Sequence, residues 1–207
     1  MKYIYKIKKY GVFRSVSILF GKLLGIKIMK FHYLKLVIDY EKAKKGSKPI
    51  SDEVIELEFN HFLTGDKNVF TDNKLELIKN RLNDNSYKAY GRIKNGVLVY
   101  STWISMYKMG LPIKSNYFLN QDEGLLEDSY CHPSERGKGL HSLMNFYRLM
   151  KLYELGKKVC LAIVLHGNTP AYKVQMKSGF EAAGIFYAGI IFGIPFSTLN
   201  KKKYDNR

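Results

Sequence analysis

A short glycine-containing turn between two apolar segments is the part of this 207-residue chain best suited to bind a phosphate. Its sequence runs Cys131-His132-Pro133-Ser134-Glu135-Arg136-Gly137-Lys138-Gly139-Leu140. The pattern predicts a strand that ends at the proline and a helix that begins at the leucine. Glycines allow close backbone approach, and the first N–H groups of a helix lack partners inside it. The amides of residues 137–142, with positive charge from Arg136 and Lys138, could therefore hold a pyrophosphate.

This turn differs from two common nucleotide-binding motifs. It lacks the GxxxxGK[ST] pattern of the P-loop, and the GxGxxG dinucleotide fingerprint does not fit it. Taken alone, a Gly-x-Gly turn is also compatible with a plain tight turn, so its function depends on what surrounds it.

Three carboxylates precede the turn on the same expected strand, namely Glu123, Glu127 and Asp128. A primary amine must lose a proton when it attacks a carbonyl, and a nearby carboxylate can accept that proton. Because side chains alternate along a strand, Glu127 and Asp128 are expected on opposite faces, with only one of them in a cleft. We favour Asp128 slightly as the general base, with Glu127 next. The alternative for each is a carboxylate at the sheet edge that pairs with one of the many lysines.

The order of the expected elements indicates a mixed α/β (α+β) domain. Asn95-Gly96 between two apolar segments predicts a β-hairpin with a type I′ turn. Apolar residues at helical spacing over 140–150 predict a helix, and the apolar run 158–165 predicts a strand buried on both faces. This strand–helix–strand unit lies inside a mostly antiparallel sheet. We further expect an extended segment at 27–39 as the strand of the N-terminal extension, strands at 54–59, 125–132, 182–188 and 190–198, helices at 72–82 and 168–178, and a looser stretch at 107–122.

Two sequence blocks together resemble the cofactor-binding half of the GNAT superfamily, the acyl-CoA-dependent N-acyltransferases. The turn resembles the family's Arg/Gln-x-x-Gly-x-Gly/Ala, and residues 166–180 resemble its Asn-x-x-Ala-x-x-x-Tyr-x-Lys-x-Gly-Phe. The resemblance covers about residues 52–199 and implies a GNAT-like, mostly antiparallel sheet flanked by helices. It also implies acetyl-CoA, or another acyl-CoA, as co-substrate. The residues implied to bind it are Tyr130, Cys131, Arg136, Gly137, Lys138, Gly139, Leu140, His141 and Asn168.

Two positions depart from the family pattern. His141 stands where many members have glycine, which narrows the phosphate pocket or gives the imidazole a phosphate contact of its own. Gln175 stands where many relatives have a tyrosine that protonates the departing thiolate; glutamine is not an acid at neutral pH, although its amide could hydrogen-bond the sulfur. Tyr172, one helical turn earlier, is a candidate substitute acid, with packing as its alternative role. Backbone amides near Tyr130 and Cys131 are implied to polarise the thioester carbonyl.

Two aromatic residues are candidates for the acceptor side of the site. Trp103 and Tyr100 lie in the second strand of the expected hairpin, where the family usually builds its acceptor pocket. An aromatic wall would suit a sugar ring or an acyl chain, and ordinary core packing is the alternative.

The formal net charge of +16 is concentrated near the N-terminus, since residues 1–48 contain 13 Lys and Arg against Asp39 and Glu41. This asymmetry indicates an anionic partner or a solvated basic face. Residues 12–24 are expected to form an amphipathic helix that is too short and too charged to cross a bilayer. We expect residues 1–50 to be a basic extension packed on or flanking a GNAT-like domain of residues 51–207, with residues 41–50 as the connector.

These features predict an N-acyltransferase, most simply an N-acetyltransferase, that moves an acyl group directly from acyl-CoA to the primary amine of a small molecule. The N-terminal extension is similar to that of bacterial relatives linked to cell-envelope polysaccharides, which suggests an amino sugar. We expect a cytoplasmic protein, with peripheral contact to an anionic inner membrane face as an option. Metal is not expected, because the histidines lack HExxH and the cysteines lack paired CxxC spacing.

Two other classes of function stay open at this stage. One is a catalytically silent module that binds acyl-CoA, and the less favoured one is a basic protein associated with nucleic acid. The sequence leaves the oligomeric state undetermined, a dimer included.

Overall fold

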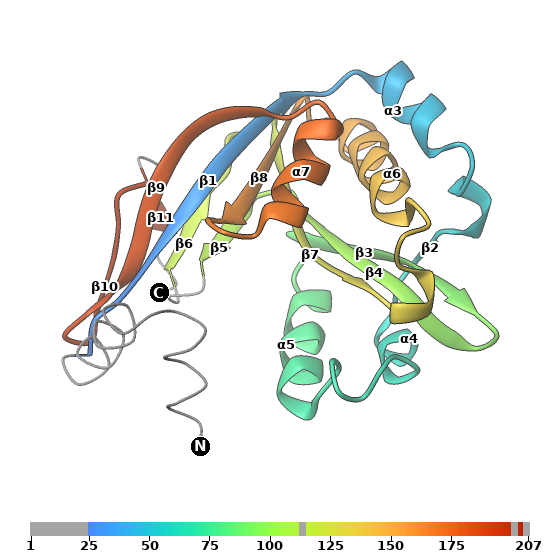
Figure 1. Ribbon diagram of the computed structural model, residues 1–207, viewed down its shortest axis with the longest axis horizontal. Helices are drawn as coiled ribbons and strands as arrows, with labels where there is room; N and C mark the ends of the chain where they lie inside the picture. Colours follow the sequence, from blue (N-terminus) through green and yellow to red (C-terminus); the bar gives the residue numbers. More distant parts are fainter. Residues whose placement is uncertain (1–24, 112–114, 200–202, 205–207) are drawn as a thin grey trace.

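The computed structural model describes residues 25–111, 115–199 and 203–204, so the expected helix at 12–24 lies outside the described residues. The described chain forms a larger sheet of order β10-β9-β1-β8-β7-β4-β3-β2 and a smaller sheet of order β11-β6-β5 (Figure 1). The strands are β1 (Lys27–Val37), β2 (Ile55–Glu56), β3 (Tyr87–Lys94), β4 (Val97–Ser105), β5 (Lys108–Leu111), β6 (Ser115–Phe118), β7 (Glu123–Cys131), β8 (Val159–Leu165), β9 (Glu181–Ile191), β10 (Ile194–Ser197) and β11 (Lys203–Tyr204).

Helices cover both faces of the larger sheet (Figure 1). α3, α6 and α7 pack on one face, while α4 and α5 pack on the other against β3 and β4. The β5–β6 hairpin packs on that second face too, against β1, β8 and β9. The helices are α3 (Tyr40–Ser47), α4 (Phe59–Leu63), α5 (Asp72–Leu82), α6 (Leu140–Glu154) and α7 (Thr169–Lys177), with short 3₁₀ turns η1 (Ser51–Glu53) and η2 (Pro133–Glu135).

The predicted hairpin of β3 and β4 is confirmed. Asn95 and Gly96 have φ angles of 52° and 75°, and the flanking residues Lys94 and Val97 are paired. A type I′ turn needs positive φ at both central residues, which asparagine and glycine tolerate best.

β1 lies inside the larger sheet, between β8 and β9. Phe31, for example, is the register partner of Leu165 on one side and of Phe186 on the other. If residues 1–50 were a separate unit, that unit would therefore contribute β1 as an interior strand to a sheet whose other strands belong to residues 51–207.

The prediction of a connector at 41–50 is wrong for most of that stretch. The Asp39 carboxylate accepts the Lys42 N–H at 3.0 Å and so caps the start of α3. Ala43 and Ser47 of this helix are buried, and Ser47 Oγ lies 3.5 Å from the sulfur of Met150 in α6. The helix forms because its small residues let it dock on α6, although its exposed face is basic.

Two further expectations need correction. The predicted strand at 54–59 pairs with β3 only at Ile55 and Glu56, and Phe59 already begins α4. The stretch 107–122 is more regular than predicted, because β5 and β6 form a hairpin within it. The expected strands and helices at 72–82, 125–132, 140–150, 158–165, 168–178, 182–188 and 190–198 all correspond to observed elements.

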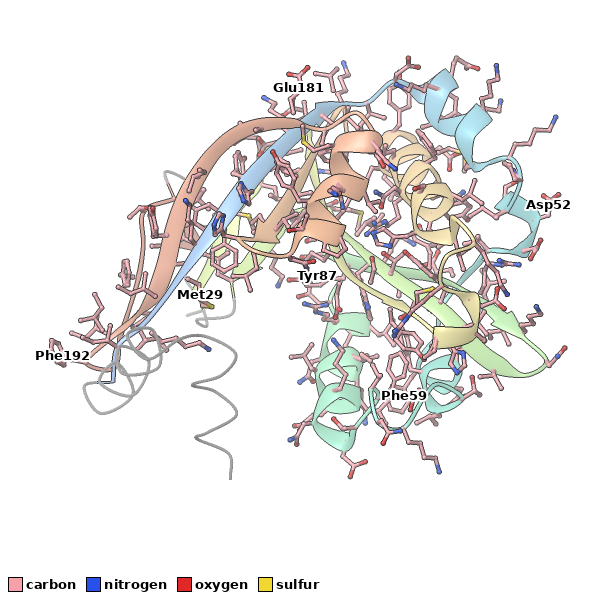
Figure 2. The ribbon with its side chains drawn as sticks, viewed as in Figure 1. Met29, Asp52, Phe59, Tyr87, Glu181 and Phe192 are labelled. Atoms are coloured by element: carbon pink, nitrogen blue, oxygen red, sulfur yellow. The ribbon has the colours of Figure 1, made fainter. Side chains whose placement is uncertain are left out.

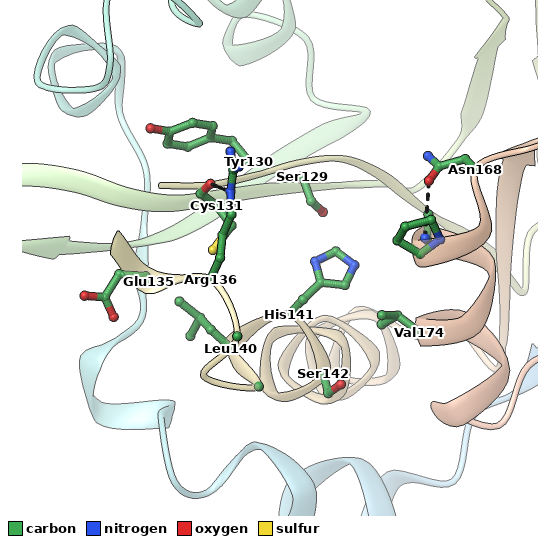
Figure 3. Close-up of a pocket in the computed structure, with 14 residues that line it drawn as sticks. Ser129, Tyr130, Cys131, Glu135, Arg136, Leu140, His141, Ser142, Asn168 and Val174 are labelled. Atoms are coloured by element: carbon green, nitrogen blue, oxygen red, sulfur yellow. Dashed lines mark hydrogen bonds between the residues drawn. The ribbon is translucent and has the colours of Figure 1, made fainter. Parts of the chain in front are cut away.

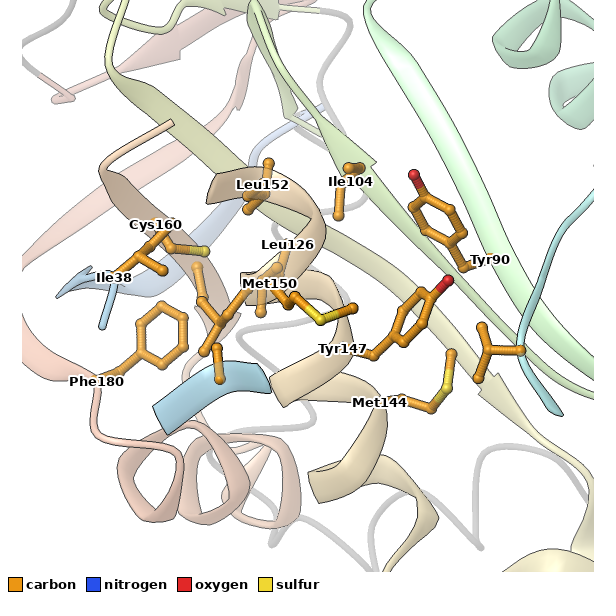
Figure 4. Packing of buried hydrophobic residues seen from close by; sticks show 14 of the residues in the cluster. Ile38, Tyr90, Ile104, Leu126, Met144, Tyr147, Met150, Leu152, Cys160 and Phe180 are labelled. Carbon is orange, nitrogen blue, oxygen red and sulfur yellow. The ribbon is translucent and has the colours of Figure 1, made fainter. Parts of the chain in front are cut away.

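The strand–helix–strand unit β7–α6–β8 sits on the main core. Figure 4 shows Met144, Tyr147 and Leu152 of α6 against the sheet, and side chains fill the space between helices and sheet (Figure 2). Gly124 of β7 permits this close packing, since a Cβ there would lie 2.4 Å from Leu152 Cδ2. The packing fixes the start of α6, where the glycine turn lies.

Candidate functional site

A pocket of about 690 Å³ opens where β7 and β8 stop pairing (Figure 3). β7 pairs with β8 in parallel only as far as Leu126, opposite Ala162. Beyond that point β7 forms one wall of the pocket, while the starts of α6 and α7 form the others. Eight of the nine residues that the resemblance assigned to the co-substrate line this pocket, and only Lys138 does not. Residues 129–142 and 168–174 are thus brought together although they are far apart in sequence.

The turn before α6 presents unpaired backbone donors to the pocket. Gly137 and Gly139 have φ angles of 79° and 73°, which glycine adopts readily. Nothing lies within 4 Å of an ideal Cβ at either position. Within the described part of the chain, the N–H groups of residues 137–141 donate to no other group. Together with the positive end of α6, they form a cradle that suits a phosphate or pyrophosphate.

The side chains of the two cations expected at this turn, Arg136 and Lys138, lie in different cavities. Arg136 lines the pocket, and its Nε–H donates to the carbonyl oxygen of Cys131 at 3.2 Å. Lys138 instead places its Nζ 3.1 Å from Glu135 Oε1, and that oxygen also lies 3.4 Å from Lys94 Nζ. Lys138 lines a neighbouring cavity of about 520 Å³. The prediction that its side chain faces the cradle is therefore wrong.

His141 enters the pocket as a neutral group. Its Nδ1 lies 2.6 Å from the hydroxyl of Tyr100, which is fully buried. Burial, and after it the positive charge of Arg148, lowers the pKa of His141 to about 4. Burial also raises the pKa of Tyr100 to about 12. His141 can therefore form a hydrogen bond to a ligand but carries no positive charge. Tyr100 does not line the pocket and acts through its hydrogen bond to His141.

The α7 side of the pocket is mostly apolar. The Asn168 side chain accepts the Ala171 N–H at 3.3 Å, which caps α7 at the pocket edge (Figure 3). Tyr172 turns away, with its ring 4.8 Å from that of His32, and lines a separate cavity of about 250 Å³. Gln175 is buried and accepts a hydrogen bond from Asn145 at 3.1 Å. Neither Tyr172 nor Gln175 presents a polar group to the main pocket.

The prediction that Glu127 and Asp128 face opposite sides of the strand is wrong. Trp103 pairs with Glu127 and Thr102 pairs with Ser129, so Asp128 is an extra residue in a β-bulge. Its φ of 28° departs from the extended backbone. A bulge breaks the alternation of side chains, and both carboxylates consequently reach the same cation on α5.

That cation is Arg81. Its NH2 lies 3.1 Å from Glu127 Oε2, and its NH1 lies 3.5 Å from Asp128 Oδ2. Asp128 also pairs with Lys74. The Glu127 side chain is only 11% exposed, and burial raises its pKa even though Arg81 opposes the rise. A buried carboxyl group with a raised pKa is suited to accept a proton near neutral pH.

Trp103 supports this carboxylate cluster from the core. It is 1% exposed and stacks on Phe62 with ring centroids 5.6 Å apart. The Arg81 guanidinium carbon lies 5.5 Å from the Trp103 ring centroid. The aromatic wall expected for an acceptor is thus covered by protein, and core packing is the role that the structure gives it.

Two arginines of this region were absent from the sequence-based candidates. Arg81 is an ordinary basic residue near the end of a helix, and nothing in the sequence marks it. Arg148 had a detectable signal, because it occupies an apolar position of the helical series Leu140, Met144, Arg148 and Leu152. It is 1% exposed in the structure. A charged residue at an apolar position of a helix is a reason to search for its partners.

Comparisons with solved structures identify the fold. A protein from Novosphingobium aromaticivorans assigned to the GNAT family of acetyltransferases gives a TM-score of 0.53 at 13% identity, over 79% of this chain and 65% of its own. A Drosophila protein gives a TM-score of 0.54 at 12% identity, over 89% of this chain and 59% of its own. A conserved protein of unknown function from Staphylococcus epidermidis gives 0.52 at 12% identity, over 83% and 65%. The chain has the GNAT fold, which confirms the fold prediction.

The chain spans less than two thirds of the length of each of these three structures. No family model matches the sequence, and no curated protein does. Within the described ranges, no helix is long and apolar enough to span a membrane. In the same ranges, no three His, Cys, Asp or Glu side chains gather in a group that could hold a metal ion.

Replacing Arg81 by methionine should destabilise the fold in a pH-dependent way. Without this cation the pKa of Glu127 rises further, so the folded state is favoured while the carboxyl is protonated and loses stability as pH rises through that pKa. We expect Arg81→Met to cost about 3 kcal/mol at pH 8 and clearly less at pH 5. Urea unfolding at both pH values measures this difference.

Arg92→Met is the matched control, because Arg92 pairs with Glu53, whose side chain is 56% exposed. Its cost should stay below about 1 kcal/mol at both pH values. An Arg81→Met variant with the same cost at pH 5 and pH 8 would contradict the described role of the pair.

Proposed function

We propose that this chain is an acyl-CoA-dependent N-acyltransferase, most simply an N-acetyltransferase that acts on a primary amine. One observation carries the proposal: a cradle of unpaired amides at the start of α6 continues into a pocket between the end of β7 and the start of α7. A GNAT fold supports it, since the Novosphingobium protein with this fold is assigned to an acetyltransferase family. The residues present fit the two chemically different ends of coenzyme A, its phosphates and its less polar arm.

In this proposal the chain's residues divide the work of binding. The amides of Gly137 to His141, with Arg136, hold the pyrophosphate. Asn168, Ala171 and Val174 border the arm that carries the thioester, and this co-substrate supplies the activated acyl group. The backbone next to the bulge, at Tyr130 and Cys131, polarises the thioester carbonyl as the resemblance implies.

In this proposal Glu127 is the general base, ahead of the initial preference for Asp128, although neither carboxylate lines the main pocket. The Asp128 carboxylate contacts both Lys74 and Arg81, so it is already paired with two cations. Glu127 has one arginine partner and a raised pKa, so it can take the amine proton as nitrogen attacks the carbonyl carbon. The tetrahedral intermediate then expels the thiolate, for which neither Tyr172 nor Gln175 provides an acid in this arrangement. A thiolate is a good leaving group and does not require one.

The acceptor and the cellular setting are part of the same proposal. We propose a small-molecule amine, with amino sugars as the first class to test, in a cytoplasmic setting. The basic residues 1–50 could attach the protein to an anionic membrane face, and co-sedimentation with anionic but not neutral vesicles tests that part. Whether residues 1–50 and 51–207 are separate units is tested by expressing residues 51–207 alone, which would lack β1.

Release of free thiol from acetyl-CoA in the presence of amino sugars, polyamines or peptides tests the activity directly. We expect at least one amine class to accelerate thiol release, with the acetylated amine identified by mass. Binding of CoA without any turnover would instead support the silent-module alternative. Absence of CoA binding by calorimetry would reject the proposed function, and salt-sensitive RNA or DNA binding would then favour the nucleic-acid alternative.

Gly139→Asp should weaken CoA binding at least about tenfold, because it places a carboxylate beside the proposed pyrophosphate. Gly156→Asp is a matched control, since Gly156 also has a positive φ of 81° and open space at its Cβ, but it lies at the other end of α6. The control should bind CoA as the parent chain does. Equal calorimetric affinities for the two folded variants would overturn the cradle assignment.

Glu127→Gln should lower kcat about 10²- to 10³-fold, because it removes the proposed proton acceptor while keeping the shape of the side chain. Asp128→Asn should cost much less. Rates measured between pH 5 and 9 check the assignment, since the acid limb of the parent profile should disappear in Glu127→Gln only. If both variants keep the parent rate and pH profile, neither carboxylate is the base.

A further inference from the structure

Arg148 is a buried cation with only neutral partners within the described part of the chain. Its NH1 donates to the carbonyl oxygens of Trp103 at 3.4 Å and Glu127 at 3.3 Å, and its NH2 donates to Asn145 Oδ1. Each salt bridge found among the described residues involves other side chains. Burying a guanidinium without a carboxylate partner costs free energy. The hydrogen bonds of Arg148 are therefore expected to hold nearby polar groups in place, which an apolar side chain could not do.

The two carbonyl groups show which part of the backbone Arg148 holds in place. Trp103 and Glu127 are register partners on β4 and β7, directly beside the bulge residue Asp128. The guanidinium therefore joins both strands at the place where the regular ladder is interrupted. Its planar group of donors can reach two carbonyls and a side-chain oxygen at once, which a lysine ammonium cannot reproduce with the same geometry.

A second arginine holds the same bulge from the opposite face of the sheet. Arg148 belongs to α6 and binds the backbone, whereas Arg81 belongs to α5 and binds the carboxylates of Glu127 and Asp128. The backbone of Glu127 is thus fixed by one arginine and its side chain by the other. This double contact keeps the Glu127 carboxylate buried.

Arg148 is itself oriented by hydrogen bonds that lead to the pocket wall. Asn145, which accepts from Arg148, donates its Nδ2 hydrogens to Gln175 Oε1 at 3.1 Å and to Ser178 Oγ at 3.0 Å. Gln175 belongs to α7, the helix whose residues Ala171 and Val174 line the pocket. A continuous buried network therefore extends from α7 through Asn145 and Arg148 to the bulge.

We propose that Arg148 is a positioning residue that sets the place and the proton affinity of Glu127 through the bulge backbone. This inference rests on the proposed function, in which Glu127 is the base. It also assigns a role to Gln175, whose amide completes the network that orients Arg148.

The test measures the pKa of the Glu127 carboxyl by carbon NMR of glutamate-labelled protein, with Glu127→Gln to assign the signal. In Arg148→Met and Arg148→Lys the bulge should relax and expose the carboxyl, so its pKa should fall toward the ordinary value. In acyl transfer, kcat should fall about tenfold or more with KM for acetyl-CoA within about threefold, because the cradle is untouched.

Lys157→Met is the matched control. Lys157 is also a buried cation, 4% exposed, whose Nζ donates to a backbone carbonyl, that of Gln121 at 2.9 Å, far from the bulge. It should lower stability without moving the Glu127 pKa. If the Arg148 variants fail to fold, Asn145→Ala provides a milder change that keeps the guanidinium but removes the acceptor of Arg148 NH2 and the donor to Gln175 and Ser178. It should shift the same pKa in the same direction by a smaller amount.

Two outcomes separate the inference from the proposed function. An unchanged Glu127 pKa in folded Arg148 and Asn145 variants overturns the positioning role, even if the enzyme acetylates amines. Absence of acyl transfer to any amine rejects the proposed function, while the pKa measurement on the ligand-free protein still decides whether Arg148 positions Glu127.

Discussion

One extra residue in β7 determines the geometry of the whole candidate site. Asp128 has no register partner on β4, and the strand bends where it is inserted. Pairing between β7 and β8 ends two residues earlier, at Leu126 and Ala162. The divergence of the two strands creates room for the pocket, and the same bulge brings Glu127 and Asp128 to Arg81. The pocket and the cluster of Glu127, Asp128 and Arg81 are therefore two consequences of one backbone irregularity.

The sequence was most informative where local chemistry decides the structure. Asn95-Gly96 specifies its turn because both residues tolerate positive φ, and the apolar run of β8 is buried as its composition requires. The glycine turn was also found, since Gly137 and Gly139 are needed for its backbone whatever the rest of the fold does. Most residues assigned to the pocket follow from that local pattern together with a known fold.

Two of the three failures have their physical origin in long-range packing. Alternation assigned Glu127 and Asp128 to opposite faces, because no local signal revealed that β7 gains a residue relative to β4. Lys138 was assigned to the phosphates, but it pairs with Glu135, a carboxylate three residues earlier, and lines another cavity. Tyr172 was considered as an acid, yet it packs beside His32 of β1, a strand whose interior position the sequence did not indicate. The errors at Asp128 and Tyr172 thus concern partners from another part of the chain, whereas Lys138 was misplaced because a local ion pair competes with the phosphates for it.

The arrangement of charge across the sheet explains how a protein of net charge +16 can keep a buried carboxyl group whose pKa is raised. On the α6 face the groups suited to bind an anion are mostly backbone amides, and the nearby His141 is neutral because burial and Arg148 lower its pKa to about 4. On the α5 face, Lys74 and Arg81 are divided between two carboxylates, so Glu127 is only partly compensated. An anionic co-substrate would therefore meet fixed dipoles on one face, while the full charges that control Glu127 stay on the other. Since the bulge backbone is the structure that both faces share, the group that holds this backbone can affect Glu127 on one face and the pocket wall on the other.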